Sequence, residues 1–417
     1  MVKRKHPEGA FYVLPNDVLV DLVDNCLPDP RDAAVLRSVS KRLRTAVDES
    51  GRNLEHERDS SILHDWRGSC QKLLDLWRED SADDFDVNAK DEDEKHVLHY
   101  AAEHGQELVV KVLIKRGAAV DVRGKYGRTP LHHAARNGHE RVVIVLLDNG
   151  ANINELDTTS STPLLDAVEK GHELVVKTLL DKGVAVNAID EALLTAAFRG
   201  NASLIKEILQ NGADVNTKDS CNWTPLHNAA FEGEDSVIKI LLENGADVAS
   251  KGNYLDDEFT LPEEDLRKGL TPLHCAASYG HETAIKILLE NGAAVDAKDE
   301  RGNTPLHEAV TLGYGSVARL LIDNGTAVDV KNIDDRTALH FAARGGNDTV
   351  VKVLLEKGAD VDAEDKFGNT AASYAVERGR VSVVKILKDA AVAKCPLTWT
   401  NYFLAKAAKA AKALSLS

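Results

Sequence analysis

The chain has 417 residues and a net charge of −16, from 51 basic and 67 acidic side chains. This acidic balance disfavours nonspecific binding to nucleic acid or to an anionic membrane surface, so neither is expected as a partner. The five cysteines are odd in number and include no C-x-x-C pair, which argues against a disulfide framework and a structural zinc site. Such usage favours a reducing compartment, here the cytoplasm and/or the nucleus. No apolar run is long enough for a secretory signal or a membrane span, and none is expected.

The first 50 residues do not follow the pattern of the rest of the chain. Residues 1–10 form a short basic tail, and residues 11–50 predict three short helices. Leu19, Leu22 and Val23 share one face of the first helix, and two further helices follow a pair of prolines. Helices this short bury little apolar surface alone, so the segment is expected to lean on its neighbour or on a partner.

This N-terminal segment contains the pairs Leu14-Pro15 and Leu27-Pro28 and the run Val39-Ser40-Lys41-Arg42. With this spacing it resembles the F-box, although Leu43 stands where that family usually has an aromatic residue. The resemblance implies binding to a Skp-type adaptor and, through it, to a cullin-based ubiquitin ligase. An ordinary helical cap on the following domain is the alternative. The resemblance places these residues on or beneath the adaptor-facing surface: Leu14, Pro15, Val18, Leu19 and Leu36.

A tetrapeptide close to T-P-L-H recurs through residues 91–394, and most of its steps are 33 residues long. A period of that length with the pattern T-P-L-H-x-A is typical of the ankyrin repeat, so this part of the chain resembles that family. The full copies begin at Thr129, Thr224, Thr271 and Thr304, and the weaker copies at Thr162 and Thr337.

Each repeat predicts a turn followed by two helices. In the best copy the Thr304 hydroxyl caps the first helix, Pro305 occupies its first position and Gly313 ends it. One repeat cannot bury its apolar face alone, so successive repeats must stack. We therefore predict an all-α fold: an ankyrin-repeat solenoid of about nine helix-turn-helix units with β-hairpin-like turns, preceded by the three-helix F-box-like segment. Residues 51–90 are expected to form a linker and a degenerate capping repeat.

Two repeats are irregular, and a tail follows the last one. The unit near Asp190 lacks the D-x-x-G turn. The step from Thr224 to Thr271 is 47 residues, so about 14 are surplus, and they form an acidic insert at 252–265. This insert is either a solvated loop or a rim of the binding surface that attracts a basic target segment. Residues 395–417 are an Ala/Lys-rich tail, for which a solvated helix is favoured over a membrane-surface helix.

The histidines and acidic residues favour a structural role over chemistry. The T-P-L-H histidine is expected to hydrogen-bond the Thr hydroxyl and neighbouring backbone, as the family resemblance implies, and His139, His172 and His281 occupy a second repeated position. No catalytic motif is present, so no enzymatic activity, catalytic residue, metal or cofactor is expected. The histidines of the first position are His99, His132, His227, His274, His307 and His340.

Binding of another protein is the expected function of the repeats. The resemblance implies a target surface made of the turn residues and of the two residues before the mid-repeat glycine. Trp223 is the foremost candidate, because Trp, Tyr and Arg dominate binding hot spots; packing against the next turn is its alternative role. The full set of expected target-binding residues is Tyr126, Arg128, Arg136, Trp223, Phe231, Tyr279, Arg301 and Arg336.

Together these features predict a monomeric substrate receptor that links an unidentified target protein to a Skp-cullin-F-box ubiquitin ligase. The alternative is an ankyrin-repeat scaffold or adaptor with no ubiquitin role.

Overall fold

The computed structural model describes residues 87–91, 94–254 and 267–394. In these residues eighteen α-helices follow one another in nine pairs, in agreement with the nine expected repeats. The chain divides into an N-terminal part, residues 1–189, and a C-terminal part, residues 190–417. The boundary lies inside helix α10 (Val186–Phe198).

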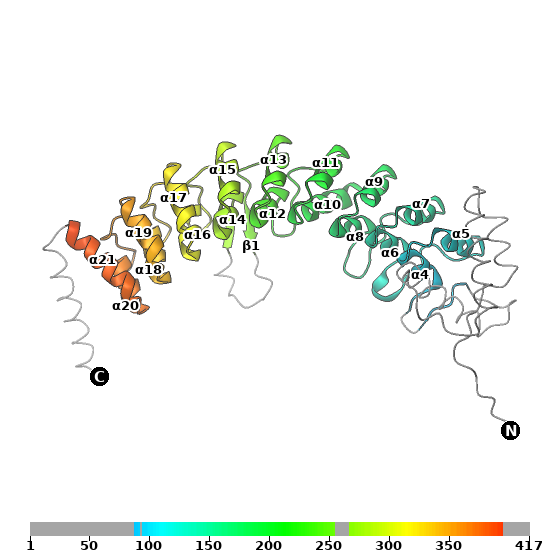
Figure 1. The fold of residues 1–417 in the computed structure, drawn as a ribbon, viewed down its shortest axis with the longest axis horizontal. Coiled ribbons are helices and arrows are strands. Elements are labelled where there is room, and N and C mark those ends of the chain that lie inside the picture. The colour runs from blue at the N-terminus through cyan, green and yellow to red at the C-terminus, as the bar shows by residue number, and fades with distance from the viewer. Residues whose placement is uncertain (1–86, 92–93, 255–266, 395–417) are drawn as a thin grey trace, which may run out of the picture. The chain divides into compact units, whose positions relative to one another are not determined.

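In the N-terminal part the first helices of successive repeats pack on one another, and so do the second helices (Figure 1). A short 3-10 turn, η1 (Lys125–Gly127), precedes the second pair. The first helices are α4 (Val97–Glu103), α6 (Pro130–Arg136) and α8 (Pro163–Lys170). The second helices are α5 (Glu107–Lys115), α7 (Glu140–Asp148) and α9 (Glu173–Asp181).

The C-terminal part repeats the same packing. Its first helices, after the end of α10, are α12 (Pro225–Glu232), α14 (Pro272–Tyr279), α16 (Pro305–Leu312), α18 (Ala338–Gly345) and α20 (Ala371–Glu377). Its second helices are α11 (Ala202–Gln210), α13 (Asp235–Glu243), α15 (Glu282–Glu290), α17 (Gly315–Asp323), α19 (Asp348–Glu356) and α21 (Val381–Lys394). Strands β1 (Gly252–Tyr254) and β2 (Arg267–Leu270) pair antiparallel before α14.

The T-P-L-H sequence starts the first helix for the reasons expected. At α16 the Thr304 side chain accepts from the backbone of the third helical residue, and the His307 ring accepts from the Thr304 backbone in return. Pro305 at the first helical position has no N–H that would need a partner there. The same reciprocal capping occurs at α6, α12, α14 and α18. At the other end of α16, Gly313 takes the left-handed conformation.

The turns connect each repeat to the next through backbone hydrogen bonds. The Ile333 N–H donates to the Arg301 carbonyl at 2.9 Å, and the Glu300 N–H donates to the Lys268 carbonyl at 3.0 Å. In the N-terminal part the Thr158 N–H donates to the Tyr126 carbonyl at 2.9 Å. These bonds are the β-hairpin-like feature expected of the turns, although only β1 and β2 form strands among the described residues.

The two irregular repeats differ in how they depart from the pattern. The repeat without a D-x-x-G turn begins its first helix early, at Val186, so α10 reaches 13 residues. The acidic insert begins later than expected: Gly252 to Tyr254 pair with Arg267 to Leu270 and so belong to the turn. The Asn253 N–H also donates to the Cys221 carbonyl at 2.8 Å. The remaining insert residues, 255–265, lie outside the described residues, as do residue 266, residues 1–86 and the tail from 395.

Candidate interaction surface

The predicted target-binding residues of the N-terminal part fall into two kinds. Tyr126 lies at the tip of a turn, adopts a φ of 62°, and is 63% exposed. Arg128 and Arg136 instead form ion pairs between neighbouring repeats. Arg128 Nε lies 3.1 Å from an oxygen of Asp157, whose side chain is fully buried. Of these three residues, Tyr126 is therefore the one whose side chain is exposed without an ion pair to a neighbouring repeat.

Arg136 and Arg128 converge on a second carboxylate, that of Asp166 on α8. Arg136 Nη1 is 2.9 Å from Asp166 Oδ1, and Arg128 Nη2 is 3.8 Å from the same atom. Burial raises the pKa of Asp166, and the two guanidinium groups oppose that rise. A buried carboxylate needs such partners, so both arginines hold the repeats together.

Trp223, the foremost candidate, is only 8% exposed and packs locally. Its ring lies 5.7 Å from the ring of His227 and 5.5 Å from that of Phe231, measured between centroids. Gly252 of β1 lies against the indole so closely that a Cβ there would be 2.6 Å from Trp223 Cδ1. The structure thus shows the local packing that was the alternative role of this residue.

Behind Trp223 the aromatic contacts continue to the surface. Phe231 at the end of α12 is half-buried, and its ring centroid lies 4.1 Å from that of Tyr279 at the end of α14. Tyr279 in turn stacks on His281 at 6.3 Å. Trp223 and Phe231 therefore support Tyr279 from beneath, and Tyr279 is the exposed member of the group.

Two exposed apolar residues near the ends of first helices were missed in the sequence. Phe198 at the end of α10 and Leu312 at the end of α16 are 44% and 48% exposed, close to the 41% of Tyr279. Each stands one or two residues before the mid-repeat glycine, Gly200 or Gly313. The rule that selected Tyr279 applies equally to both. We define Phe198, Phe231, Tyr279 and Leu312 as the apolar row of the C-terminal part.

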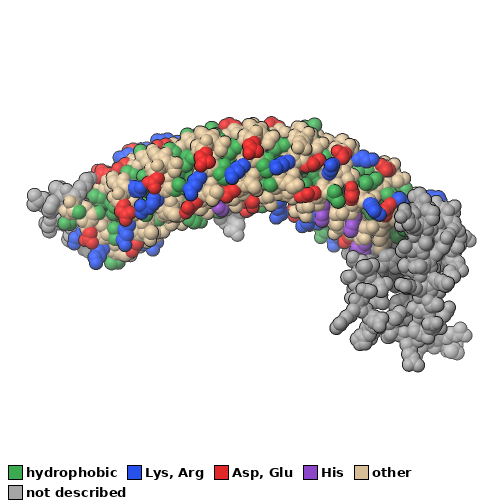
Figure 2. Space-filling model, turned by 45° about the horizontal axis from the view of Figure 1, so that its top comes forward, with side chains coloured by type: hydrophobic (Ala, Val, Ile, Leu, Met, Phe, Trp, Pro, Cys, Tyr) green, Lys and Arg blue, Asp and Glu red, His purple; other side chains and the backbone are tan. Residues whose placement is uncertain are grey.

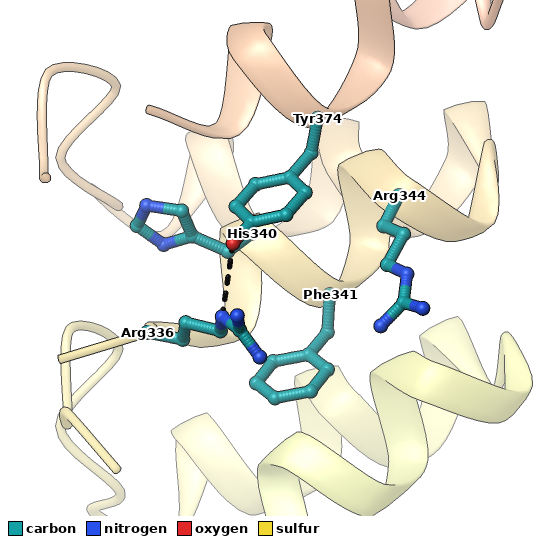
Figure 3. A pocket seen from close by; sticks show the side chains of 5 residues that line it. All are labelled: Arg336, His340, Phe341, Arg344 and Tyr374. Atoms are coloured by element: carbon teal, nitrogen blue, oxygen red, sulfur yellow. Dashed lines mark hydrogen bonds between the residues drawn. The ribbon is translucent and has the colours of Figure 1, made fainter. Parts of the chain in front are cut away.

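Arg301 and Arg336 are both half-buried at turns. Arg336 Nε lies 3.0 Å from the Tyr374 hydroxyl oxygen and 3.7 Å from Asp365 Oδ2 (Figure 3). The Tyr374 hydroxyl donates to that same Asp365 oxygen at 2.6 Å. Arg336 is therefore held by an internal network, as Arg128 is in the N-terminal part.

The T-P-L-H histidines have the hydrogen bonds expected of them. The Thr304 N–H donates to His307 Nδ1 at 3.0 Å, so Nε2 carries the proton and donates to the Arg336 carbonyl at 3.3 Å. Burial lowers the pKa of His307 and His274 to about 4, which keeps both rings neutral. Among the described residues no group of three His, Cys, Asp or Glu side chains is placed to hold a metal ion.

The rest of the visible surface mixes charges of both signs. Figure 2 shows Lys and Arg side chains interspersed with Asp and Glu on the face in view. The predicted adaptor-binding residues, Leu14, Pro15, Val18, Leu19 and Leu36, lie outside the described residues. Within the ranges that the structure describes, no helix is long and apolar enough to cross a membrane.

Comparison with protein families supports the repeat assignment. A family model described as Ankyrin repeats (3 copies) matches residues 67–157, 98–190, 164–252, 252–332 and 314–395. These overlapping matches span well over half of the chain. No curated protein matches the chain.

Proposed function

Because the chain belongs to the ankyrin-repeat family, whose repeats are protein–protein interaction modules, we propose that it binds a partner protein through the apolar row of its C-terminal part. The row is formed by the C-terminal ends of the first helices α10, α12, α14 and α16.

One observation supports this site above others: apolar side chains occupy one of the two positions before the mid-repeat glycine in four successive repeats, and three of the four are exposed. Phe198, Tyr279 and Leu312 are each 41–48% exposed. The buried core of these repeats is formed by other residues, such as Leu226 and Leu273. Aromatic residues in a supported position make good anchors, because they bury a large area at little cost in conformational entropy.

Affinity capture from cell extract followed by mass spectrometry tests the proposal. The bait is the full chain, compared with the double variant Tyr279→Ala, Leu312→Ala. The matched control is Leu174→Ala, which removes an exposed apolar side chain from α9 in the other part of the chain. The partner should be captured by the wild type and by the control but not by the double variant.

A captured partner allows the affinity to be measured directly. Tyr279→Ala alone should weaken binding by about 2 kcal/mol, the scale of a central anchor. The variant must retain the thermal unfolding of the wild type, so that a loss of binding does not reflect a loss of fold. Equal affinities of the wild type and of the double variant would refute the proposed site.

We further propose that the chain links this partner protein to a cullin-based ubiquitin ligase, as the F-box resemblance implies. This would take place in the cytoplasm and/or the nucleus. The support is the sequence spacing of residues 11–50. Deleting residues 1–50 should abolish co-purification of a Skp-type adaptor while the repeats remain folded, and the double change Leu14→Ala, Pro15→Ala should weaken it. Adaptor retained by the deletion variant would refute binding through this segment, and absence of adaptor and cullin from the wild-type capture would favour the alternative, a scaffold with no ubiquitin role.

A further inference from the structure

The ion pairs of the N-terminal part define a geometry for holding a carboxylate between two arginines. Arg128 precedes the T-P-L-H sequence, and Arg136 follows it on the same helix, eight residues later. The carboxylate of Asp166, at the equivalent of His133 in the next repeat, lies within 2.9 Å of Arg136 and 3.8 Å of Arg128. One carboxylate there accepts from one guanidinium and lies close to the other.

The same register recurs in the C-terminal part, with one chemical difference. Arg336 and Arg344 occupy the positions of Arg128 and Arg136, again eight residues apart. Thirty residues after Arg344, where Asp166 would be expected, stands Tyr374. A neutral phenol has therefore replaced the carboxylate.

Arg344 forms no ion pair among the described residues, although Glu377 stands at the position of Glu169, which lies 3.6 Å from Arg136. Arg336 keeps its internal partners, since Asp365 and Asp334 lie 3.7 Å and 3.6 Å from it. The exposed Arg344 side chain has no ion pair or side-chain hydrogen bond within the described residues. Arg136 by contrast lies 2.9 Å from a carboxylate oxygen of the next repeat.

Beside Arg344 the surface is hollowed. A small, shallow hollow, open to solvent, is lined by Arg336, His340, Phe341, Arg344 and Tyr374 (Figure 3). Phe341 and Tyr374 supply apolar walls, and His340 is kept neutral because burial lowers its pKa. A charged group entering here meets a guanidinium flanked by low-dielectric aromatic surface, which strengthens a charge-assisted hydrogen bond.

We infer that Arg344, with Phe341 and Tyr374, forms a subsite for the carboxylate of an Asp or Glu side chain in a partner protein. This inference rests on the proposed function, because it identifies one chemical feature of the protein that the repeats bind. The Arg344 guanidinium has no ion-pair partner of its own among the described residues and so matches a single negative charge, whereas the nearby carboxylates Asp334 and Asp365 disfavour a doubly charged phosphate. The net charge of −16 disfavours nucleic acid as the source of the anion.

The test is to select, from a library of displayed random peptides, those that bind the full chain. Selected peptides are synthesised with amidated C-termini, so that the only carboxylates are those of side chains. One position of the selected peptides should be Asp or Glu. Changing that residue to Asn or Gln should weaken binding to the wild type by roughly tenfold or more, the scale of a hydrogen bond to a charged group.

Two variants and a control assign the effect to the subsite. Arg344→Gln should bind the acidic and the amide peptide about equally, a loss of coupling that a double-mutant cycle measures. Tyr374→Asp restores the carboxylate that Asp166 provides and should exclude the acidic peptide by repulsion. Arg319→Gln is the matched control: it removes the same charge from α17, where Arg319 pairs with Glu356, and should keep the acid preference.

The outcomes separate the inference from the proposed function. The subsite is overturned if the peptides lose affinity for Tyr279→Ala but prefer Asp or Glu to the same extent on Arg344→Gln as on the wild type. In that case the proposed function still stands. An acid preference lost equally in Arg319→Gln reveals a general charge effect and also overturns it. Binding that disappears on amidation assigns the anion to a C-terminal carboxylate and overturns the choice of a side chain. Failure of every peptide to bind contradicts both proposals.

Discussion

Mild acid should destabilise the C-terminal part by protonating the buried T-P-L-H histidines. In the folded state the ring Nδ1 of His227, His274 and His307 accepts the N–H of the capping threonine at 3.0–3.2 Å. Protonation of Nδ1 removes that acceptor and places a charge in a buried site. Burial accordingly lowers the pKa of all three rings from 6.5 to about 4.

The sign and the size of the effect follow from proton linkage. Between about pH 6.5 and 4 the unfolded chain binds these protons and the folded chain does not, so stability falls as the pH falls. From about pH 7 to about pH 5, one histidine with these two pKa values loses about 2 kcal/mol of unfolding free energy. Near the middle of the window the slope is about 1 kcal/mol per pH unit for each ring. The three rings interact, so their losses are not strictly additive.

Urea unfolding at several pH values in this window measures the effect. The decisive comparison is between the wild type and His307→Gln, because other groups titrate in both chains and cancel. Burial raises the pKa of Asp299, for example, which changes stability in the opposite direction. The variant should be less stable at neutral pH, with a slope lower by about 1 kcal/mol per pH unit. If unfolding free energy depends on pH with the same slope in the wild type and in His307→Gln, the conclusion that the folded His307 ring is buried and neutral is refuted.

Three further substitutions test packing and ion pairing by the change in unfolding free energy. Trp223→Ala should cost about 3–5 kcal/mol because it empties a buried indole site, and a loss below about 1 kcal/mol would contradict that packing. Gly252→Ala should cost about 1–3 kcal/mol, since its Cβ would lie 2.6 Å from the indole; Gly345→Ala, with no atom within 4 Å, is the control and should be near neutral. Arg136→Ala should cost about 1–3 kcal/mol by leaving the buried Asp166 carboxylate without its closest donor, and an unchanged stability would show that Arg128 suffices.

The repeat architecture could be predicted from the sequence because its determinants are local. Thr304, Pro305 and His307 form the capping contacts of α16 within one helical turn, so the tetrapeptide itself specifies where the helix starts. Gly313 then specifies where it ends, through its left-handed conformation. The same local signals mark most of the other first helices, and the nine helix pairs followed from counting them.

The extent of the insert could not be predicted from repeat spacing alone. Counting surplus residues placed Gly252 outside the repeat, but pairing with β2 places it inside the turn. The pairing partner is distant in the sequence, at Leu270, and Gly252 also packs closely against the indole of Trp223. Residue type alone left two roles open for Trp223, a binding anchor and local packing, and its 8% exposure results from packing against neighbours in other segments.

The sequence by itself determined the period, the helix starts and ends, and the residue types available at the surface. Only the tertiary structure decided which arginines remain unpaired. Arg136 and Arg344 occupy the same position of their repeats, and nothing local distinguishes them. Their environments differ because the next repeat presents a carboxylate to one and a phenol to the other, at Asp166 and Tyr374. Stacking brings residues thirty positions apart into contact, and the charge balance of each site is set there.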